Sequence, residues 1–192
     1  MAWCCFSLLA MSVFLTLYTC KAFILPPMNH LTLSNFSWSN CEENLPGRVK
    51  HLIFNPNVIS FPGILNFSES YETNVPLISP LKIVYNVERE ILGDWINVPC
   101  FENFGSCTLD NLCNLLDLIF KPGEACPALL STYNIPCHCP FKAGTYTFPK
   151  ISIHLPNLKV PTWLVSGKYH TTEMIYSGEE KVSCTQYSYS LQ

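Results

Sequence analysis

Cysteine is the residue type whose number and spacing say most about the chemistry of this chain. Eight cysteines follow an apolar N-terminal segment: Cys41, Cys100, Cys107, Cys113, Cys126, Cys137, Cys139 and Cys184. An even set behind a secretory leader is typical of a disulfide framework in an oxidising compartment. Four disulfides would use all of these thiols, so the pattern argues against thiol nucleophiles and thiolate metal ligands.

A zinc site is the alternative use of the Cys137-His138-Cys139 block, because thiolates and imidazole are zinc ligands. The even cysteine count favours disulfides instead. The five histidines are dispersed, and no His-x-x-x-His pair occurs. We therefore expect neither a metal site nor a cofactor.

Catalytic patterns are weak. Glu88 and Glu90 are two residues apart on an expected strand, so they share a face, and paired carboxylates can hydrolyse glycosides. Two solvated carboxylates at a strand end are the more common arrangement. A serine hydrolase would use a Gly-x-Ser-x-Gly elbow, which the sequence lacks. The sequence therefore predicts no catalytic residues.

The N-terminus resembles a secretory signal peptide. Phe6 to Leu17 is almost wholly apolar, and Cys20-Lys21-Ala22 offers small residues at the two positions that signal peptidase recognises. We predict a signal peptide over residues 1–22 and one domain over residues 23–192. An uncleaved N-terminal anchor is the alternative, since no Lys or Arg precedes Phe6.

The charge of the mature chain depends strongly on pH. Without Lys21 the chain has 10 basic and 14 acidic side chains, a formal charge of −4. There is no basic run, which argues against a nucleic-acid partner. At about pH 4.5 the net charge would be about +6, and such a protein would be attracted to anionic lipid surfaces. The sequons at Asn35 and Asn66 predict glycosylation.

Most of the chain has the period of β-strands interrupted by 15 prolines and eight glycines. Apolar and polar residues alternate along three segments, and two later segments predict a closing hairpin across residues 177–180. The alternating segments are 65–71, 81–88 and 151–155, and the hairpin strands are Tyr169 to Tyr176 and Val182 to Leu191.

One helix is expected inside the cysteine-dense segment from Cys100 to Cys139. Leucines and an isoleucine recur at helical spacing from Leu109 to Ile119, Thr108 could cap the start, and Lys121-Pro122-Gly123 would end the helix. We therefore predict an all-β antiparallel cup or sandwich with one short helix in a disulfide-rich insertion. A hydrophobic fraction of 48% against 13% charged residues fits an apolar cavity, and a solid sandwich is the alternative.

Several motifs, in this order, resemble one family. They are Phe36-Ser37-Trp38-Ser39-Asn40-Cys41, Trp95-Ile96-Asn97-Val98-Pro99-Cys100, Gly105-Ser106-Cys107, Leu115-Leu116-Asp117, Pro136-Cys137-His138-Cys139-Pro140-Phe141-Lys142 and Pro161-Thr162-Trp163-Leu164. Over roughly residues 36–184 the chain resembles the ganglioside GM2 activator family, a branch of the MD-2-related lipid-recognition proteins. The sequence does not distinguish a direct counterpart from a paralogue.

The resemblance implies a β-cup whose apolar cavity holds lipid tails, with no catalysis of its own. Such a protein lifts a glycosphingolipid, a ganglioside, partly out of the membrane surface and presents it to a lysosomal β-hexosaminidase. By position it also implies the disulfides Cys41–Cys184, Cys100–Cys107, Cys113–Cys139 and Cys126–Cys137. The expected location is the lysosome, the secretions, or both.

The resemblance further implies two membrane-facing loops, one with Ile91, Leu92 and Trp95 and one with Trp163 and Leu164. Tryptophan favours the bilayer interface, although both tryptophans could instead be core residues. Asp94 stands where the family has an aliphatic residue, and a carboxylate opposes insertion at neutral pH. His170 stands where the family has arginine, and it would be positively charged only in acid.

Three functions follow from these observations. The leading hypothesis is a non-enzymatic glycosphingolipid-transfer and activator protein. Asp94 and His170 favour an alternative, a secreted lipid-binding glycoprotein without a hexosaminidase partner. An independent lipid hydrolase is the third hypothesis, and turnover of lipid by the purified protein alone would identify it.

Overall fold

The structure is a computed structural model that describes residues 31–158 and 166–192, except residue 102. This part of the chain forms two sheets. The larger sheet has the order β3-β1-β10-β9-β5-β6, with β7 paired to β5, and the smaller has the order β2-β4-β8. The strands of the larger sheet are β1 (Leu31–Asn40), β3 (Ile59–Phe61), β5 (Leu81–Ile91), β6 (Asp94–Asn97), β7 (Thr108–Leu109), β9 (Gly167–Ser177) and β10 (Glu180–Leu191). Those of the smaller sheet are β2 (Gly47–Asn55), β4 (Gly63–Thr73) and β8 (Gly144–Leu155).

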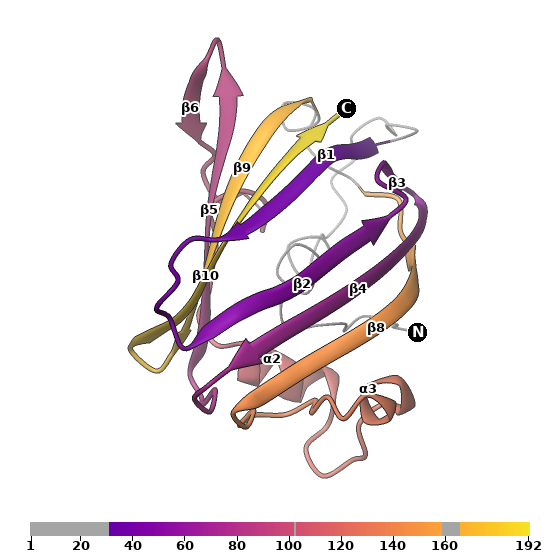
Figure 1. The fold of residues 1–192 in the computed structure, drawn as a ribbon, viewed down its shortest axis with the longest axis vertical. Helices are drawn as coiled ribbons and strands as arrows, with labels where there is room; N and C mark the ends of the chain where they lie inside the picture. Colours follow the sequence, from indigo (N-terminus) through magenta and orange to yellow (C-terminus); the bar gives the residue numbers. More distant parts are fainter. Residues whose placement is uncertain (1–30, 102, 159–165) are drawn as a thin grey trace.

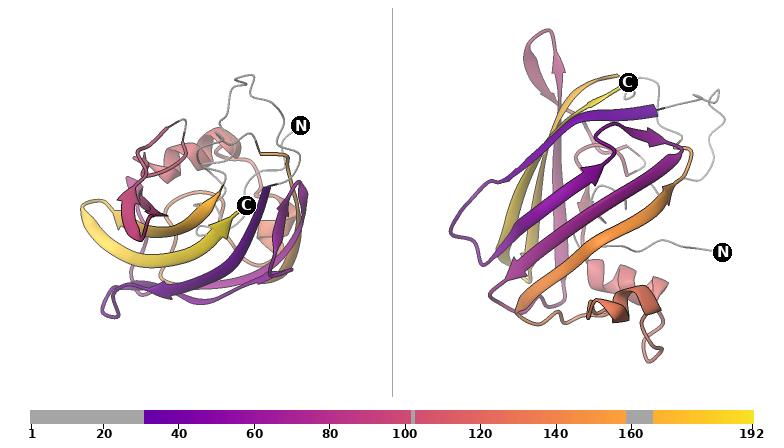
Figure 2. Two further views of the ribbon diagram at one scale, coloured as in Figure 1. Left: turned by 90° about the horizontal axis from the view of Figure 1, so that it is seen from above. Right: turned by 45° about the vertical axis from the view of Figure 1, so that its right-hand side comes forward.

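All strand pairs in the two sheets are antiparallel, which confirms the predicted all-β class. The sheets face each other and curve around a shared interior (Figures 1 and 2). The helices α2 (Leu112–Ile119) and α3 (Ala128–Thr132) lie at one end of this arrangement, and the hairpin of β5 and β6 projects from the other (Figure 1). The predicted leader, residues 1–22, lies outside the described residues.

The strands follow the alternation in the sequence. In β5, Leu81, Ile83, Tyr85 and Val87 are buried while the residues between them are partly exposed. In β4 the buried positions include Leu65, Phe67 and Tyr71, as predicted. Successive side chains of a strand point to opposite faces, so each strand contributes one apolar face to the interior. The predicted closing hairpin is confirmed as β9 and β10.

Two clusters of buried apolar side chains fill much of the interior. One includes Ile83 of β5, Ile175 of β9 and Leu112 of α2. The other surrounds Leu65 and Phe67 of β4. Burying a large aliphatic or aromatic side chain stabilises a fold by about 1.5–3 kcal/mol, so these clusters are the main source of stability.

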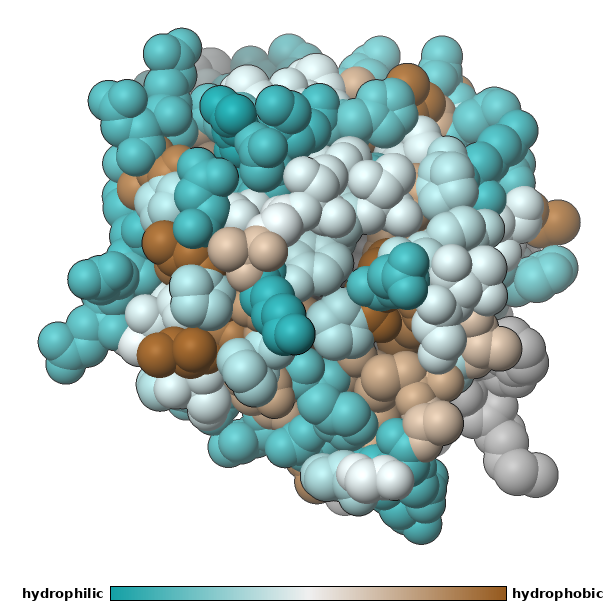
Figure 3. Space-filling view, turned by 60° about the horizontal axis from the view of Figure 1, so that its bottom comes forward, coloured by the Kyte–Doolittle hydropathy of each residue, from teal (hydrophilic) through white to brown (hydrophobic). Residues whose placement is uncertain are grey.

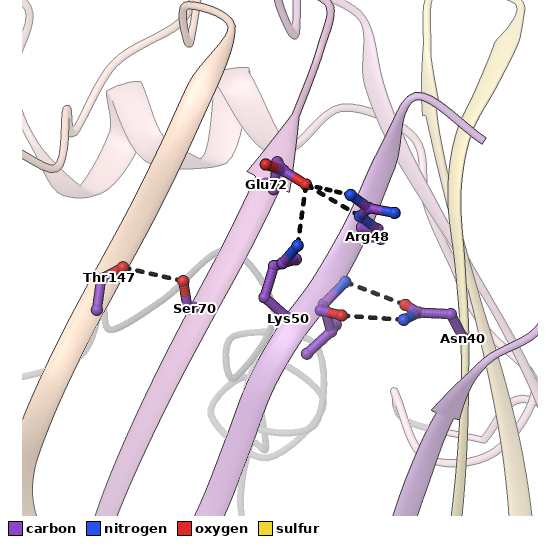
Figure 4. Close-up of polar contacts among 7 residues, drawn as sticks. Asn40, Arg48, Lys50, Ser70, Glu72 and Thr147 are labelled. Atoms are coloured by element: carbon purple, nitrogen blue, oxygen red, sulfur yellow. Dashed lines mark hydrogen bonds and ion pairs between the residues drawn. The ribbon is translucent and has the colours of Figure 1, made fainter. Parts of the chain in front are cut away.

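Side chains of β1 join the two sheets at the free edge of β2. The Asn40 carboxamide donates to the Val49 carbonyl at 2.9 Å and accepts from the Val49 N–H at 3.0 Å (Figure 4). The Trp38 indole N–H donates to the Leu52 carbonyl at 2.9 Å. These bonds satisfy backbone groups that an edge strand would otherwise leave to water. Trp38 therefore has a structural role, because it links β1 to β2.

The helical segment differs from the prediction in two ways. The helix α2 is Leu112–Ile119, and its N-cap is Asn111, whose side chain accepts a hydrogen bond from the Cys113 N–H, so the predicted cap at Thr108 is wrong. Thr108 and Leu109 instead form β7, because Leu109 pairs with Ile83 of β5. A second helix, α3 (Ala128–Thr132), was not predicted. Its five residues are too few to show a helical period in the sequence.

Four disulfides connect these elements, in the pairs that the family resemblance implies. Cys41–Cys184 joins the end of β1 to β10, and Cys100–Cys107 closes the loop that follows β6. Cys113–Cys139 and Cys126–Cys137 hold α2 and the segment around α3.

Among the described residues, no helix is both long and apolar enough to cross a bilayer.

Candidate functional site

The hairpin of β5 and β6 projects from one end of the molecule (Figure 1). Several of its apolar side chains are exposed. The Leu92 side chain is fully exposed, at 102%, while Ile91 and Ile96 are about half exposed, at 47% and 49%. Asp94 is exposed and pairs with Ile91 next to the turn. The structure thus places the predicted residues Ile91 and Leu92 at a protruding tip.

The turn of this hairpin holds a leucine in an unfavourable backbone conformation. Leu92 and Gly93 connect the strands, and both have positive φ, 56° and 94°. Two-residue turns of this kind prefer Asn-Gly, because a leucine in the left-handed region costs roughly 1–2 kcal/mol. Backbone strain of this kind tends to persist at functional sites. The tip therefore combines an unfavourable backbone with an exposed apolar side chain.

Trp95 does not extend from the tip. Its ring lies on the outer face of the large sheet, stacked on His170 of β9 with ring centroids 3.6 Å apart and an angle of 13°. Between them runs β5, where Glu90 is paired with Lys168 at 2.8 Å. The side chain is 37% exposed. The structure thus brings together Trp95 and His170, a contact that no pattern in the sequence indicates.

A second group of exposed apolar residues lies at the opposite end. On α2, Leu118 is 82% exposed and Ile119 is 40% exposed. Figure 3 shows the molecule with its lower side forward, and the apolar residues there form separate patches among hydrophilic ones. Leu118 has no unfavourable backbone of the kind seen at Leu92, and it therefore serves as a comparison for the hairpin.

The inner face of the large sheet is more polar than the composition predicts. Strand register places its side chains in rows across β10, β9 and β5. The first row is Thr185, Glu173 and Tyr85, the second is Tyr187, Thr171 and Val87, and the third is Tyr189, Tyr169 and Arg89. The small sheet opposes this wall with mostly apolar residues, such as Leu65 and Phe148, but also with Glu69.

Burial keeps the phenols of this wall neutral. Burial raises the pKa of Tyr189 to about 12, partly offset by the hydrogen bond with Thr171. Burial also raises the pKa of Tyr187 well above its usual value, and the neighbouring carboxyl groups of Glu173 and Glu69 raise it further. The Tyr187 hydroxyl donates to Oε2 of Glu173 at 3.3 Å. Several hydroxyl groups and the carboxyl group of Glu173 thus lie on this wall.

Arg89 lies in the row of the wall that is nearest to the hairpin. Its guanidinium is 5.9 Å from the centre of the Tyr169 ring, and it donates to the Ser166 carbonyl. A cation over an aromatic face is stabilised by the ring quadrupole. Trp163 and Leu164, the predicted second membrane loop, lie outside the described residues.

The predicted glycosylation positions are both in strands. Asn35 is exposed, lies at an irregularity of the pairing between β1 and β10 and has a positive φ of 53°, which asparagine tolerates better than most residues. Asn66 is on the outer face of β4 and accepts a hydrogen bond from Ser152.

The residues of the possible zinc and catalytic patterns make other contacts in the structure. Cys137 and Cys139 form disulfides, and His138 contacts Asp117 at 2.8 Å. No group of three or more possible metal ligands occurs in the described part of the chain. Glu90 is paired with Lys168, and Glu88 lies opposite His170 on the outer face.

Glu69 and Glu173 are the residues of the site that sequence reasoning missed. Each is an even number of positions away from buried apolar residues of its own strand, so it points to the same inner face. In β4, Glu69 alternates in step with Leu65 and Phe67. In β9, Glu173 does so with Tyr169 and Ile175. This two-residue alternation is the signal in the sequence that could have placed both carboxyl groups inside the protein.

Comparisons with known proteins identify the family. The sequence profile of the ML domain matches residues 35–191. The ganglioside GM2 activator of Mus musculus is 41% identical over 169 residues, 88% of either chain, and that of Macaca fascicularis is 40% identical over 172 residues, 88% of this chain and 90% of the other.

Two solved structures show only low similarity. A Niemann-Pick type C2 protein from Japanese carpenter ant gives a TM-score of 0.39 at 11% identity, over 79% of this chain and 96% of the other. Chicken MD-1 complexed with lipid IVa gives 0.37 at 11% identity, over 90% and 94%. The family assignment therefore rests on the sequence comparisons. By these, the chain belongs to the ML-domain family, within the group of ganglioside GM2 activators and their close paralogues.

Proposed function

We propose that this chain is a non-enzymatic lipid-binding and transfer protein that extracts a glycosphingolipid from membranes and presents it to a lysosomal β-hexosaminidase. The observation that supports this most directly is Leu92, which is 102% exposed with a φ of 56° at the tip of the projecting hairpin. An exposed leucine in this conformation contributes nothing to folding. Contact with an apolar surface outside the protein gives it a role.

The hairpin would make that contact with the bilayer. Moving an exposed aliphatic side chain out of water is favourable by about 1.5–3 kcal/mol, and Ile91, Leu92 and Ile96 would enter together. Trp95 flanks them, and tryptophan is enriched at the boundary between lipid and water. Trp163 and Leu164 would form the second membrane loop. Asp94 would oppose insertion less when it is protonated.

The space between the sheets would hold the lipid tails. The small sheet offers an apolar inner face with Leu65, Phe67 and Phe148. The name of the two relatives, ganglioside GM2 activator, supports a ganglioside as the lipid and an activator role rather than enzymatic activity. Four disulfides, the leader at residues 1–22 and glycosylation at Asn35 and Asn66 would fit a lysosomal or secreted protein.

One alternative keeps lipid binding and removes the hexosaminidase. The stacking of Trp95 on His170 favours it, because the stack holds Trp95 against the sheet rather than at the tip. In that case the protein would be a secreted lipid-binding glycoprotein. Assays with ganglioside, protein and β-hexosaminidase distinguish the two functions. An activator raises sugar release by the added enzyme and releases none alone, whereas release without added enzyme would indicate a hydrolase.

Leu92→Asn tests the role of the hairpin tip. Asparagine suits the left-handed turn, so the variant should be at least as stable as the wild type. Extraction of fluorescent ganglioside from liposomes should fall several-fold, because the apolar tip is lost.

The matched control is Leu118→Asn, the same change at the 82% exposed leucine of α2. It should leave extraction unchanged. Equal extraction by the wild type and Leu92→Asn, or an equal loss in the two variants, would contradict a specific membrane role for this hairpin.

A further inference from the structure

The outer face of the small sheet has a charge opposite to that of the chain as a whole. Among the described residues, this face carries three basic side chains, Arg48 and Lys50 of β2 and Lys150 of β8, and one carboxylate, Glu72 of β4. In the rest of the described chain, twelve Asp and Glu residues stand against six Lys and Arg residues. The face is therefore a cationic surface on an acidic protein.

Strand pairing brings these charges into one half of the sheet. Oε2 of Glu72 accepts hydrogen bonds from Nε and Nη2 of Arg48 at 2.9 and 2.8 Å and lies 3.5 Å from Nζ of Lys50 (Figure 4). Lys150 lies in the bulge of β8 beside Ser68 of β4. Ser68 and Glu72 are four positions apart on β4, which is about 13 Å in an extended strand. We call Arg48, Lys50 and Lys150 the basic patch.

Glu72 alone does not neutralise the basic patch. One carboxylate is shared by Arg48 and Lys50, and the side chains of these two residues remain 48% and 45% exposed. Lys150 is exposed and forms no ion pair with another described residue. Like charges held close together on a sheet are destabilising. The excess positive charge is therefore complementary to a negative surface outside the chain.

The position of the patch favours a soluble partner over a bilayer. The strand β4 runs towards the end of the molecule that holds the helices, away from the projecting hairpin, and the patch lies along its second half (Figure 1). When the hairpin tip enters a membrane, the outer face of the small sheet lies to the side, in water. Attraction between exposed charges is screened over about 8 Å in physiological salt, so the patch gains little from that membrane.

We propose that the basic patch docks an acidic region of the hydrolase that receives the lipid. The inference rests on the proposed function, because it names the surface through which the chain would present its lipid. The protein would contact the membrane through its hairpin and the enzyme through its small sheet. A glycan at Asn66, which is on the same face two positions before Ser68, would border the patch on one side. Complementary charge of this kind speeds the encounter of two proteins and fixes their orientation.

Lys150→Glu tests the patch, because this lysine has no ion pair whose loss would disturb the fold. Release of sugar from ganglioside in liposomes by β-hexosaminidase is measured against the concentration of the added protein. The half-saturating concentration should rise about threefold to tenfold in the variant, and this difference should shrink at high salt. Extraction of fluorescent ganglioside from the same liposomes without the enzyme should be unchanged.

The matched control is Lys121→Glu, the same change at a lysine that is 80% exposed and follows α2. It alters the net charge of the chain equally but lies outside the patch, so the half-saturating concentration should stay at the wild-type value. An equal shift in both variants would mean that net charge alone matters, and this would refute the role of the patch.

The other outcomes separate docking from the proposed function. Activation by the wild type that Lys150→Glu reproduces at every concentration would overturn the docking surface and leave the activator function intact. A wild type that does not raise sugar release at all would overturn both.

Two further measurements identify a different occupant of the patch. A loss of binding by Lys150→Glu to vesicles of phosphatidylcholine and phosphatidylserine, in proportion to its loss of activation, would show that the patch contacts membrane and refute docking of the enzyme. Sedimentation that shows a wild-type dimer and a monomeric Lys150→Glu would assign the patch to a second copy of the chain and refute it equally.

Discussion

Asn40→Ala should destabilise the fold more than its partly exposed position suggests, because this side chain joins the two sheets. The substitution removes two hydrogen bonds, one to the Val49 carbonyl at 2.9 Å and one from the Val49 N–H at 3.0 Å. Each such bond contributes about 0.5–1.5 kcal/mol, so their loss should lower the free energy of unfolding by about 2 kcal/mol. For a domain of this size the melting temperature should fall by about 4–8 °C.

Urea unfolding of the protein with its disulfides intact, followed by tryptophan fluorescence, measures this loss. Asn40→Asp is the informative companion, because a carboxylate keeps the acceptor for the Val49 N–H and loses the donor to the carbonyl. At pH 7 it should be at least as destabilising as Asn40→Ala, since two acceptors then face each other. A loss below about 0.5 kcal/mol for Asn40→Ala, within the range of ordinary surface substitutions, would refute the role of this joint.

Two further predictions concern covalent and charged links. Replacing both Cys41 and Cys184 by alanine removes a disulfide between residues 143 positions apart in the sequence. The free energy of unfolding, measured in urea, should fall by about 3–5 kcal/mol. A loss near zero would contradict the role of this disulfide in holding the ends of the domain together. On the outer face of the small sheet, the hydrogen bond from Arg48 lowers the pKa of the Glu72 carboxyl below 4.5, with Lys50 contributing to a smaller extent (Figure 4). A lowered pKa in the folded state stabilises above the unfolded-state value, and this stabilisation disappears as pH falls through the folded-state value. The difference in melting temperature between the wild type and Glu72→Gln should therefore shrink between pH 5 and pH 3, and a difference independent of pH would contradict the ion pair's contribution.

Much of the fold could be predicted because a half-buried strand shows apolar and polar residues in alternation along the sequence. The alternation from Leu81 to Val87 and the hairpin across Gly178 both correspond to strands of the structure. The cap of α2 could not be located in this way. Asn111 and Thr108 are both good capping residues, and the choice depended on the pairing of Leu109 with Ile83, 26 positions earlier in the chain.

The site was less predictable because its contacts cross between strands. Ile91 and Leu92 were expected in a membrane-facing loop because of the family resemblance, and the structure places Leu92 in the turn of a hairpin with Ile91 beside it. The stacking of Trp95 on His170 depends on both strands flanking β5, and no local pattern reports it. The composition suggested a uniformly apolar interior, whereas the rows through Glu173 and Thr185 make one wall polar.

The joint at Asn40 has a consequence for how the protein behaves among other copies of itself. A free strand edge is a template onto which another chain can add, and it is a common origin of aggregation. The edge of β2 is closed in part by Asn40 and Trp38. The far edge of the same sheet is β8, where Pro149 lacks an N–H and lies with Lys150 at a bulge opposite β4. Both edges of the small sheet are thus protected, in part, against pairing with strands of other copies of the chain.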